Sequence, residues 1–170
     1  MSACCARHGQ EEFFDERAAR RSAERYRRRG ADAMARSLAR RAGAQGVEGA
    51  SVLEIGGGIG QVMFELLERG AARGEVVELL PSYEPFVGRL ADERGLGERV
   101  AFRTADLVAD PAAGVPADLV VLAKSDLVPA AALADIERRL SAVLRPTSAV
   151  ARPDPAAQPD SWYYRGDRHA

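Results

Sequence analysis

Four closely spaced glycines and two carboxylates stand where a nucleotide-like ligand could be bound. The glycines follow a short β-branched run that reads Ser-Val-Leu-Glu-Ile, and they are Gly56, Gly57, Gly58 and Gly60. Glycine tolerates positive φ angles and lets a ligand approach the backbone without meeting a Cβ atom. Where such a loop opens a helix, free N–H groups and the helix dipole add a partial positive charge. The loop is therefore the first candidate for a ligand site.

The two carboxylates narrow the class of ligand. Glu54 stands two residues before the loop, where an anion would repel a pyrophosphate but suits a ligand that carries an ammonium and a sulfonium group. Glu78 lies about as far downstream as a ribose-binding acid is expected. A carboxylate at that position can accept two hydrogen bonds from the hydroxyls of a diol.

The glycine spacing argues against a dinucleotide. The dinucleotide fingerprint requires a third glycine three positions after its second. That position holds Gln61 if the pattern starts at Gly56, and Met63 if it starts at Gly58. Neither frame fits, so the sequence disfavours a nicotinamide-dependent oxidoreductase.

A GTPase is a second alternative, because the stretch from Asp118 to Pro129 resembles the guanine-recognition segment (Asn-Lys-x-Asp) of metallochaperone-type GTPases. A phosphate-binding loop requires Gly-x-x-x-x-Gly-Lys-Ser/Thr. Lys124 is the single lysine of the chain and lies outside such a loop, so this interpretation fails. In the same stretch Asp126 is the one plausible catalytic carboxylate, and no general base is assigned.

Strands and helices alternate around these residues. We expect strands at 51–55, 75–80, 99–104, 118–123 and 147–152, with helices at 61–69, 85–94 and 129–144. Such alternation predicts parallel pairing through right-handed crossovers. The predicted fold is α/β: a Rossmann-like, doubly wound, mostly parallel sheet, in which ligands bind beyond the carboxyl ends of the strands.

A long helix is predicted ahead of the sheet, over residues 11–42, with Gly30 as its one obvious break. Its loose apolar stripe comprises Phe13, Phe14, Ala18, Tyr26, Met34 and Leu38. Its arginines are Arg20, Arg21, Arg25, Arg27, Arg28 and Arg29. Such a cluster could meet an acidic substrate or partner. A solvated face, partly balanced by Asp15, Glu16, Glu24 and Asp32, is the favoured interpretation.

Taken together, residues 13–122 resemble a class I S-adenosylmethionine-dependent methyltransferase, as found in small bacterial proteins. That family carries an acid and Gly-x-Gly-x-Gly at strand one, an acid after strand two and Asp after strand three. The matching residues are Glu54, Gly56, Gly58, Gly60, Glu78 and Asp106. The resemblance implies S-adenosylmethionine as cofactor, with its methionine portion on the glycine loop. It further implies Glu78 on the ribose, Asp106 on the adenine amino group, and Leu79 and Leu107 beside the ring.

The carboxyl-terminal part departs from this family, whose seven-stranded sheet ends in an antiparallel hairpin. At most five strands fit before proline-rich sequence begins, so the sheet is expected to be incomplete. We predict an N-terminal tail with basic helices (1–50), a Rossmann-like cofactor-binding domain (51–152) and a proline-rich tail (153–170). The predicted function is methyl transfer to a small-molecule acceptor. The alternative is a non-catalytic S-adenosylmethionine-binding or partner-binding module. A homodimer is one way to cover the open sheet edge.

The length, charge and cysteine content of the chain limit which other classes of protein it can belong to. With 170 residues the chain can hold one ordinary α/β core, and its net charge of -1 predicts no strong attraction to nucleic acid or an anionic membrane. No apolar run approaches the roughly 18 residues that span a bilayer, and the N-terminus does not resemble a signal peptide, so a cytoplasmic location is expected. The adjacent Cys4 and Cys5 form no disulfide framework. A metal role for them with His8 is disfavoured.

Overall fold

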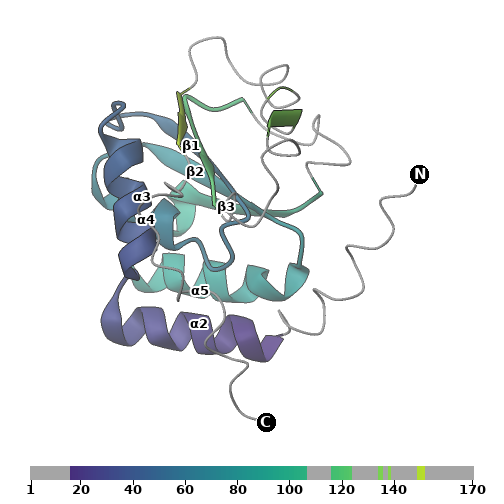
Figure 1. Ribbon diagram of the computed structural model, residues 1–170. Coiled ribbons are helices and arrows are strands. Elements are labelled where there is room, and N and C mark those ends of the chain that lie inside the picture. Colours follow the sequence, from purple (N-terminus) through teal and green to yellow (C-terminus); the bar gives the residue numbers. More distant parts are fainter. Residues whose placement is uncertain (1–15, 107–115, 124–133, 136–137, 139–148, 152–170) are drawn as a thin grey trace, which may run out of the picture.

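The computed structural model contains one five-stranded parallel sheet (Figure 1). It describes residues 16–106, 116–123, 134–135, 138 and 149–151. The strands are β1 (Ser51–Ile55), β2 (Arg73–Glu78), β3 (Val100–Thr104), β4 (Leu119–Leu122) and β5 (Ala149–Ala151). Their order in the sheet is β3-β2-β1-β4-β5, and every neighbouring pair is parallel. The predicted Rossmann-like α/β fold is therefore confirmed.

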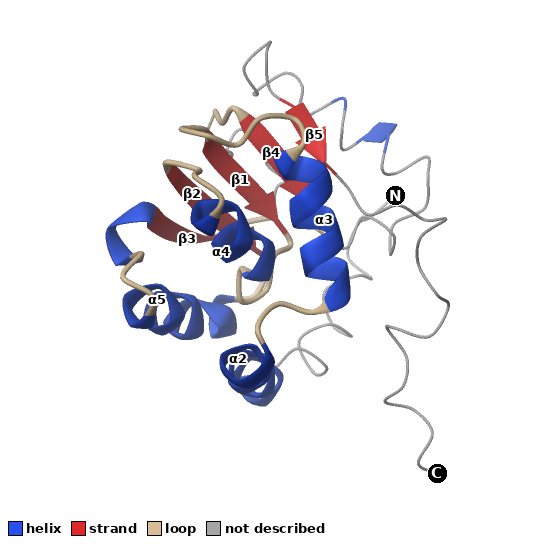
Figure 2. Ribbon diagram, turned by 90° about the vertical axis from the view of Figure 1, so that its left-hand side faces the viewer, coloured by secondary structure: helices blue, strands red, loops and turns tan. Residues whose placement is uncertain are grey.

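Helices cover one face of this sheet. They are α2 (Glu16–Arg29), α3 (Ala33–Gly43), α4 (Gln61–Glu68) and α5 (Glu84–Glu93), with short 3-10 helices η2 (Pro81–Tyr83) and η3 (Gly97–Arg99). Figure 2 shows α3 and α4 in front of the sheet and α5 below them, and both ribbon views place α2 beside α5. No helix in the described part of the chain is long and apolar enough to cross a membrane.

Strand alternation separates two sets of core side chains. On the helix-covered face, Val52, Val76 and Val121 pack with α4 and α5. The intervening residues of the same strands face the other side, where Leu53, Val77, Val120 and Leu122 form a second cluster. Successive side chains of a strand point to opposite faces, so each of these central strands is apolar on both. All four residues of β4 are buried, as its unbroken apolar run predicts.

The N-terminal helical segment is broken at the glycine that the sequence indicates. The segment expected over residues 11–42 is two helices in the described residues, α2 and α3, with a bend between them. Gly30 adopts φ of +69° at this bend, and the Asp32 side chain caps α3 by accepting a hydrogen bond from the Ala35 N–H at 2.8 Å. Gly30, the expected break, thus ends α2.

Both N-terminal helices belong to the main core. Tyr26 of α2 and Leu38 of α3 are almost fully buried in the cluster that also contains the helix-facing side of the sheet. The opposite side of α2 carries the predicted arginines, all of them exposed. Two of these pair with acids: Arg20 with Glu16 at 2.8 Å and Arg27 with Glu93 at 2.7 Å. The predicted boundary after residue 50 stays a prediction.

Most other element boundaries agree within two residues. β2 starts and ends two residues before the predicted 75–80, because the Leu79 N–H turns to the Glu78 side chain and Pro81 opens η2. β5 lies within the predicted fifth strand, 147–152. The predicted helix 129–144 lies almost entirely outside the described residues, as do Phe13, Phe14 and the proline-rich tail.

Candidate functional site

The glycine loop and the predicted acids come together at the carboxyl edge of the parallel sheet. In the strand register Ile55 lies opposite Val77 of β2 and Leu122 of β4, so the loop begins level with Glu78. The Gly56 N–H donates to the Val77 carbonyl at 2.8 Å, and the Ala105 N–H donates to the Glu78 carbonyl at 3.1 Å. This edge is where parallel α/β sheets bind ligands.

The loop requires glycine for both conformation and space. Gly56 and Gly60 have φ of +72° and +77°, a region that L side chains rarely adopt. A Cβ atom on Gly56 would lie 3.2 Å from the Ala123 carbonyl oxygen, and one on Gly60 would lie 3.1 Å from Cγ2 of Val76. The first and last glycines of the motif therefore let the backbone turn closely over β4 and β2.

The Glu54 side chain, which precedes this loop, is hydrogen-bonded to the start of α4, the helix that follows it. This side chain is 1% exposed and lies on the helix-covered face of β1, where Oε2 accepts a hydrogen bond from the Met63 N–H at 2.8 Å. A carboxylate in the first turn of a helix is favoured by the helix dipole. A Cβ atom on Gly57 would lie 2.6 Å from Cδ of Glu54, so the glycine gives this carboxylate its place. Sequence reasoning missed this contact, and a role of Glu54 toward a ligand ammonium stays a prediction.

Glu78 is held by the same loop from the other side. It is 6% exposed; Oε2 accepts from the Gly58 N–H at 2.9 Å, and Oε1 accepts from its neighbouring Leu79 N–H at 2.8 Å. Each carboxylate oxygen has two lone-pair directions, and these backbone bonds orient the group. The carboxylate is thus a fixed acceptor at the edge of the sheet.

The remaining predicted residues fall into two groups. Asp106 is half-buried two residues after β3, and Leu79 is half-buried after β2. Leu107, Lys124 and Asp126 lie outside the described residues, as do Cys4, Cys5 and His8. In the described part of the chain no three histidine, cysteine or acidic side chains cluster as metal ligands would.

Tyr83, which ends the short helix η2 after β2, is 4% exposed in the core. Its ring lies 3.5 Å from the place that a Cβ atom on Gly58 would take. It packs beneath the loop and supports the backbone whose N–H holds Glu78.

A pair of hydrogen bonds joins the N-terminal bend to the glycine loop. Gln61, the first residue of α4, accepts from the Asp32 N–H at 2.9 Å through Oε1 and donates from Nε2 to Oδ2 of Asp32 at 3.1 Å. Asp32 also caps α3. We call this arrangement the Asp32–Gln61 clasp. Sequence reasoning used Gln61 only as a missing glycine, because nothing in the spacing links residues that are 29 positions apart.

The fold has well-matched relatives among solved structures. No protein-family model and no curated protein matches the chain. An O-methyltransferase family protein from Burkholderia thailandensis aligns with a TM-score of 0.62 at 23% identity, over 84% of this chain and 43% of that one. The mitomycin 7-O-methyltransferase MmcR aligns with a TM-score of 0.57 at 24% identity, over 69% and 35%. A Thiobacillus denitrificans methyltransferase, solved with S-adenosyl-L-homocysteine, aligns with a TM-score of 0.55 at 20% identity, over 69% and 47%.

The chain therefore has the class I S-adenosylmethionine-dependent methyltransferase fold that its sequence predicts. At these identities the likeness is one of fold. The chain spans between 35% and 47% of the length of these three proteins.

Proposed function

We propose that this protein binds S-adenosylmethionine at the carboxyl edge of its sheet and transfers the methyl group to a small-molecule acceptor. The observation that carries the proposal is the Glu78 carboxylate. It stands at the end of β2, and one of its two backbone hydrogen bonds comes from the glycine loop. This is an acceptor fixed in advance for the hydroxyls of a ribose.

The chemistry of the neighbouring groups fits the rest of the cofactor. Gly56 and Gly57 of the glycine loop are partly exposed, so their backbone is open to the methionine portion, and Glu54 places a buried carboxylate close to it. Asp106 lies one strand further along the same edge, where its carboxylate would accept from the adenine amino group. Leu79 and Leu107 would flank the ring. The solved relative with bound S-adenosyl-L-homocysteine supports this assignment.

The protein's own contribution to the reaction is positioning. Bound S-adenosylmethionine supplies a methyl group that is already activated by its sulfonium. The chain aligns the acceptor with that group and excludes water, which is where much of the rate enhancement of such a transfer can arise. The rigid loop, fastened by Glu54 and Glu78, holds one side of this alignment. A general base that tunes the acceptor is not assigned.

A small-molecule acceptor is supported by the net charge of -1, which provides no broad attraction to nucleic acid, and by the mitomycin methyltransferase among the relatives. The second candidate function is a non-catalytic module that binds S-adenosylmethionine or a partner. It is favoured by the chemistry of the described residues, among which no general base is assigned. The predicted cytoplasmic location and homodimer remain predictions.

Two experiments test these functions in order. Calorimetry on the full chain should show saturable binding of S-adenosylhomocysteine in the micromolar range and none of NAD. Absence of S-adenosylhomocysteine binding would overturn the enzyme and the S-adenosylmethionine-binding module, and would leave only a partner-binding module. Release of S-adenosylhomocysteine from S-adenosylmethionine, measured over a panel of small acceptors, then separates the enzyme from the module, because only the enzyme releases the product.

A further inference from the structure

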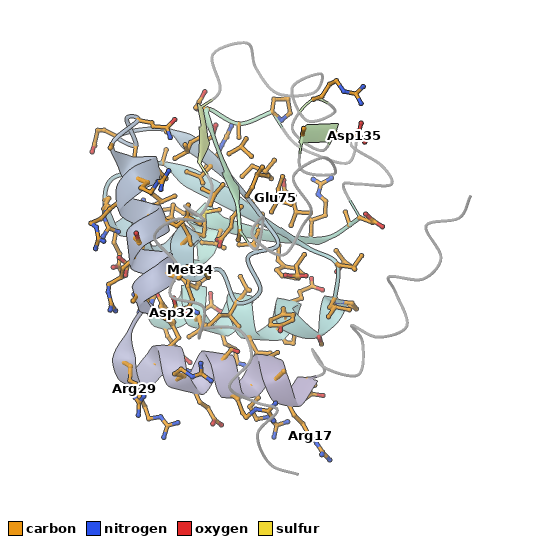
Figure 3. All side chains as sticks on the ribbon, viewed as in Figure 1. Arg17, Arg29, Asp32, Met34, Glu75 and Asp135 are labelled. Atoms are coloured by element: carbon orange, nitrogen blue, oxygen red, sulfur yellow. The ribbon has the colours of Figure 1, made fainter. Side chains whose placement is uncertain are left out.

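A pocket of about 460 Å³ opens at the bend between α2 and α3. This volume lies in the range of small-molecule sites. Its lining includes Ser22, Arg25, Arg29, Asp32, Arg36 and Gln61. We call it the bend pocket. Figure 3 shows Arg29 at the end of α2 and Asp32 at the start of α3, on the two sides of the bend.

The charges that line the bend pocket do not balance. Three of its side chains are guanidinium groups, and its one carboxylate is already in use: Oδ1 of Asp32 caps α3, and Oδ2 accepts from Gln61. Arg36 donates to the Ala31 carbonyl oxygen. Among the described residues, neither Arg25 nor Arg29 forms a hydrogen bond or ion pair. The pocket therefore carries a net positive charge of two, from three arginines less one aspartate.

This pair of arginines differs from the other arginines of α2 because it lines the pocket. Arg20 and Arg27 are paired with Glu16 and Glu93, and the exposed Arg21 and Arg28 do not line the pocket. Arg25 and Arg29 stand four residues apart, so they lie on one face of α2, next to each other. Two adjacent guanidinium forks suit a carboxylate or a phosphate, which each fork can bind through two parallel hydrogen bonds.

The walls of the bend pocket are fixed by the fold. Gly30 turns the chain at φ of +69°, and the Asp32–Gln61 clasp holds the next turn against the start of α4. Tyr26, which also lines the pocket, is 1% exposed and stacks on Phe64 of α4 with 5.7 Å between the ring centres. A site with a rigid backbone loses little freedom when it binds a ligand.

The bend pocket also adjoins the proposed cofactor site. Gln61 lines the pocket and follows directly on Gly60, the last glycine of the loop. A small molecule held in the pocket would thus lie next to the loop on which the methionine portion of the cofactor is proposed to bind. The solvated-face interpretation describes Arg20, Arg21, Arg27 and Arg28, which do not line the pocket, whereas Arg25 and Arg29 do line it.

We propose that the bend pocket binds the carboxylate or phosphate group of the methyl acceptor, which is therefore an anionic small molecule. The binding of the anion rests on the pocket alone, whereas its assignment to the acceptor rests on the proposed function. The carboxylate of the cofactor itself is a second anion that could reach these arginines, so the test must distinguish the two.

The test compares two double variants of the full chain that lose the same charge from the same helix. R25Q/R29Q removes the arginines of the pocket, and R21Q/R28Q removes exposed arginines that do not line it. Phenyl phosphate and benzoate are titrated by calorimetry into each protein, with and without S-adenosylhomocysteine, at low salt. Circular dichroism confirms that both variants fold.

We expect saturable binding of at least one of these anions by the unaltered chain. Binding should be about tenfold or more weaker in R25Q/R29Q and change by less than about twofold in R21Q/R28Q, since about tenfold corresponds to one charge-assisted contact. The affinity for S-adenosylhomocysteine should stay within about twofold in both variants.

Three results would overturn the proposal. The first is an absence of specific anion binding: either the unaltered chain shows no saturable binding, or both variants bind the anion equally weakly. Equal weakening would mean that the anion responds to the overall charge of α2. The second is a loss of S-adenosylhomocysteine affinity in R25Q/R29Q, which would assign the arginines to the cofactor carboxylate. The third is anion binding by a chain that fails to bind S-adenosylhomocysteine at all; the proposed function would then fail and the assignment to an acceptor with it, although an anion site would exist.

Discussion

The Glu78 carboxylate accepts hydrogen bonds from the backbone and is also proposed to bind the ribose hydroxyls of the cofactor. A conservative substitution tests the proposed binding role. In Glu78→Gln the amide can accept one of the two backbone hydrogen bonds, but its NH₂ group faces a second N–H instead of accepting from it. We expect the dissociation constant of S-adenosylhomocysteine to rise about tenfold or more, because a hydrogen bond to a charged group contributes about 1.5–3 kcal/mol. Calorimetry measures this change.

Glu75→Gln is the matched control for this experiment. Glu75 lies on the same strand, away from its carboxyl end, and pairs with Arg103 at 2.6 Å. The control should bind S-adenosylhomocysteine as the unaltered chain does. Equal weakening in both variants would mean that Glu78 acts only through the stability of β2.

Tyr26 presents a second test at this scale. Its ring is buried between Phe64 and the guanidinium of Arg94, yet among the described residues its hydroxyl has no hydrogen-bond partner. A buried hydroxyl without a partner is unfavourable, so Tyr26→Phe should leave the free energy of unfolding unchanged or raise it. Tyr26→Ala should lower it by about 3–5 kcal/mol, because a cavity replaces the ring.

Urea denaturation measures the free energy of unfolding of both Tyr26 variants. The dependence of this free energy on pH is a second, independent test. Burial raises the pKa of the Tyr26 hydroxyl above its ordinary value. The folded state then keeps a proton that the unfolded chain loses above about pH 10, so stability should fall there more steeply in the unaltered chain than in Tyr26→Phe. A clear destabilisation by Tyr26→Phe at neutral pH would show that the hydroxyl has a partner.

Among the elements, the turn from β1 into α4 depends most on its glycines. Gly60→Ala places a side chain at φ of +77° and 3.1 Å from Val76, so we expect a loss of about 1–3 kcal/mol in unfolding free energy. The control is Gly88→Ala inside α5, where a Cβ atom meets nothing within 4 Å. Alanine is the better helix former, so this control should gain about 0.4–1 kcal/mol. Thermal denaturation distinguishes the two; a stable Gly60→Ala protein would contradict the tight loop.

The elements also show how far the sequence predicts this fold. β1 was predicted at the bounds that it has, because its β-branched run stops at glycines. The edge that gathers Gly56, Glu78 and Asp106 was predicted because parallel strands share one carboxyl end. The hydrogen bonds that Glu54 accepts from Met63 of α4 and Glu78 accepts from Gly58 of the loop were not predicted, since they depend on the left-handed turns of the loop.

The sequence indicates a break at Gly30 but not the geometry of the bend between α2 and α3. A single Gly30 within a helical pattern does not decide between a tolerated glycine and a helix end. The decision is made by the Asp32–Gln61 clasp, a contact between residues that the fold brings together and that no local pattern records. The bend pocket is formed by this bend. The sequence alone therefore does not show that its arginines line one pocket.

At the scale of the whole molecule, one ion pair links α2 to α5 across the surface. Its hydrogen bond from Arg27 holds the pKa of Glu93 below its ordinary value. The folded state then binds fewer protons than the unfolded chain, so the pair contributes stability above the unfolded glutamate pKa of about 4.3 and loses it as pH falls through the lowered value. The pair is exposed, so its contribution should be small and decrease with salt.

Urea midpoints of the unaltered chain and of Glu93→Gln test this pair. The unaltered chain should be slightly more stable at pH 7, and the difference should shrink by about pH 3. Arg27→Gln combined with Glu93→Gln completes a double-mutant cycle that isolates the pair from other effects of each change. A difference that stays the same at both pH values would contradict the electrostatic origin.

The central place of β1 has a consequence for how the chain folds. β1 pairs with β2, which follows shortly in the sequence, and also with β4. Asp118, the residue before β4, accepts a hydrogen bond from Ser51 across 67 positions. Contacts this distant form slowly, because a long loop must close before they contribute. During synthesis β1, β2 and β3 precede β4 by the 14 residues between Thr104 and Leu119, so the half-sheet β3-β2-β1 can form first. Until then one edge of the most central strand is open, and the nascent chain must keep it from pairing with other strands.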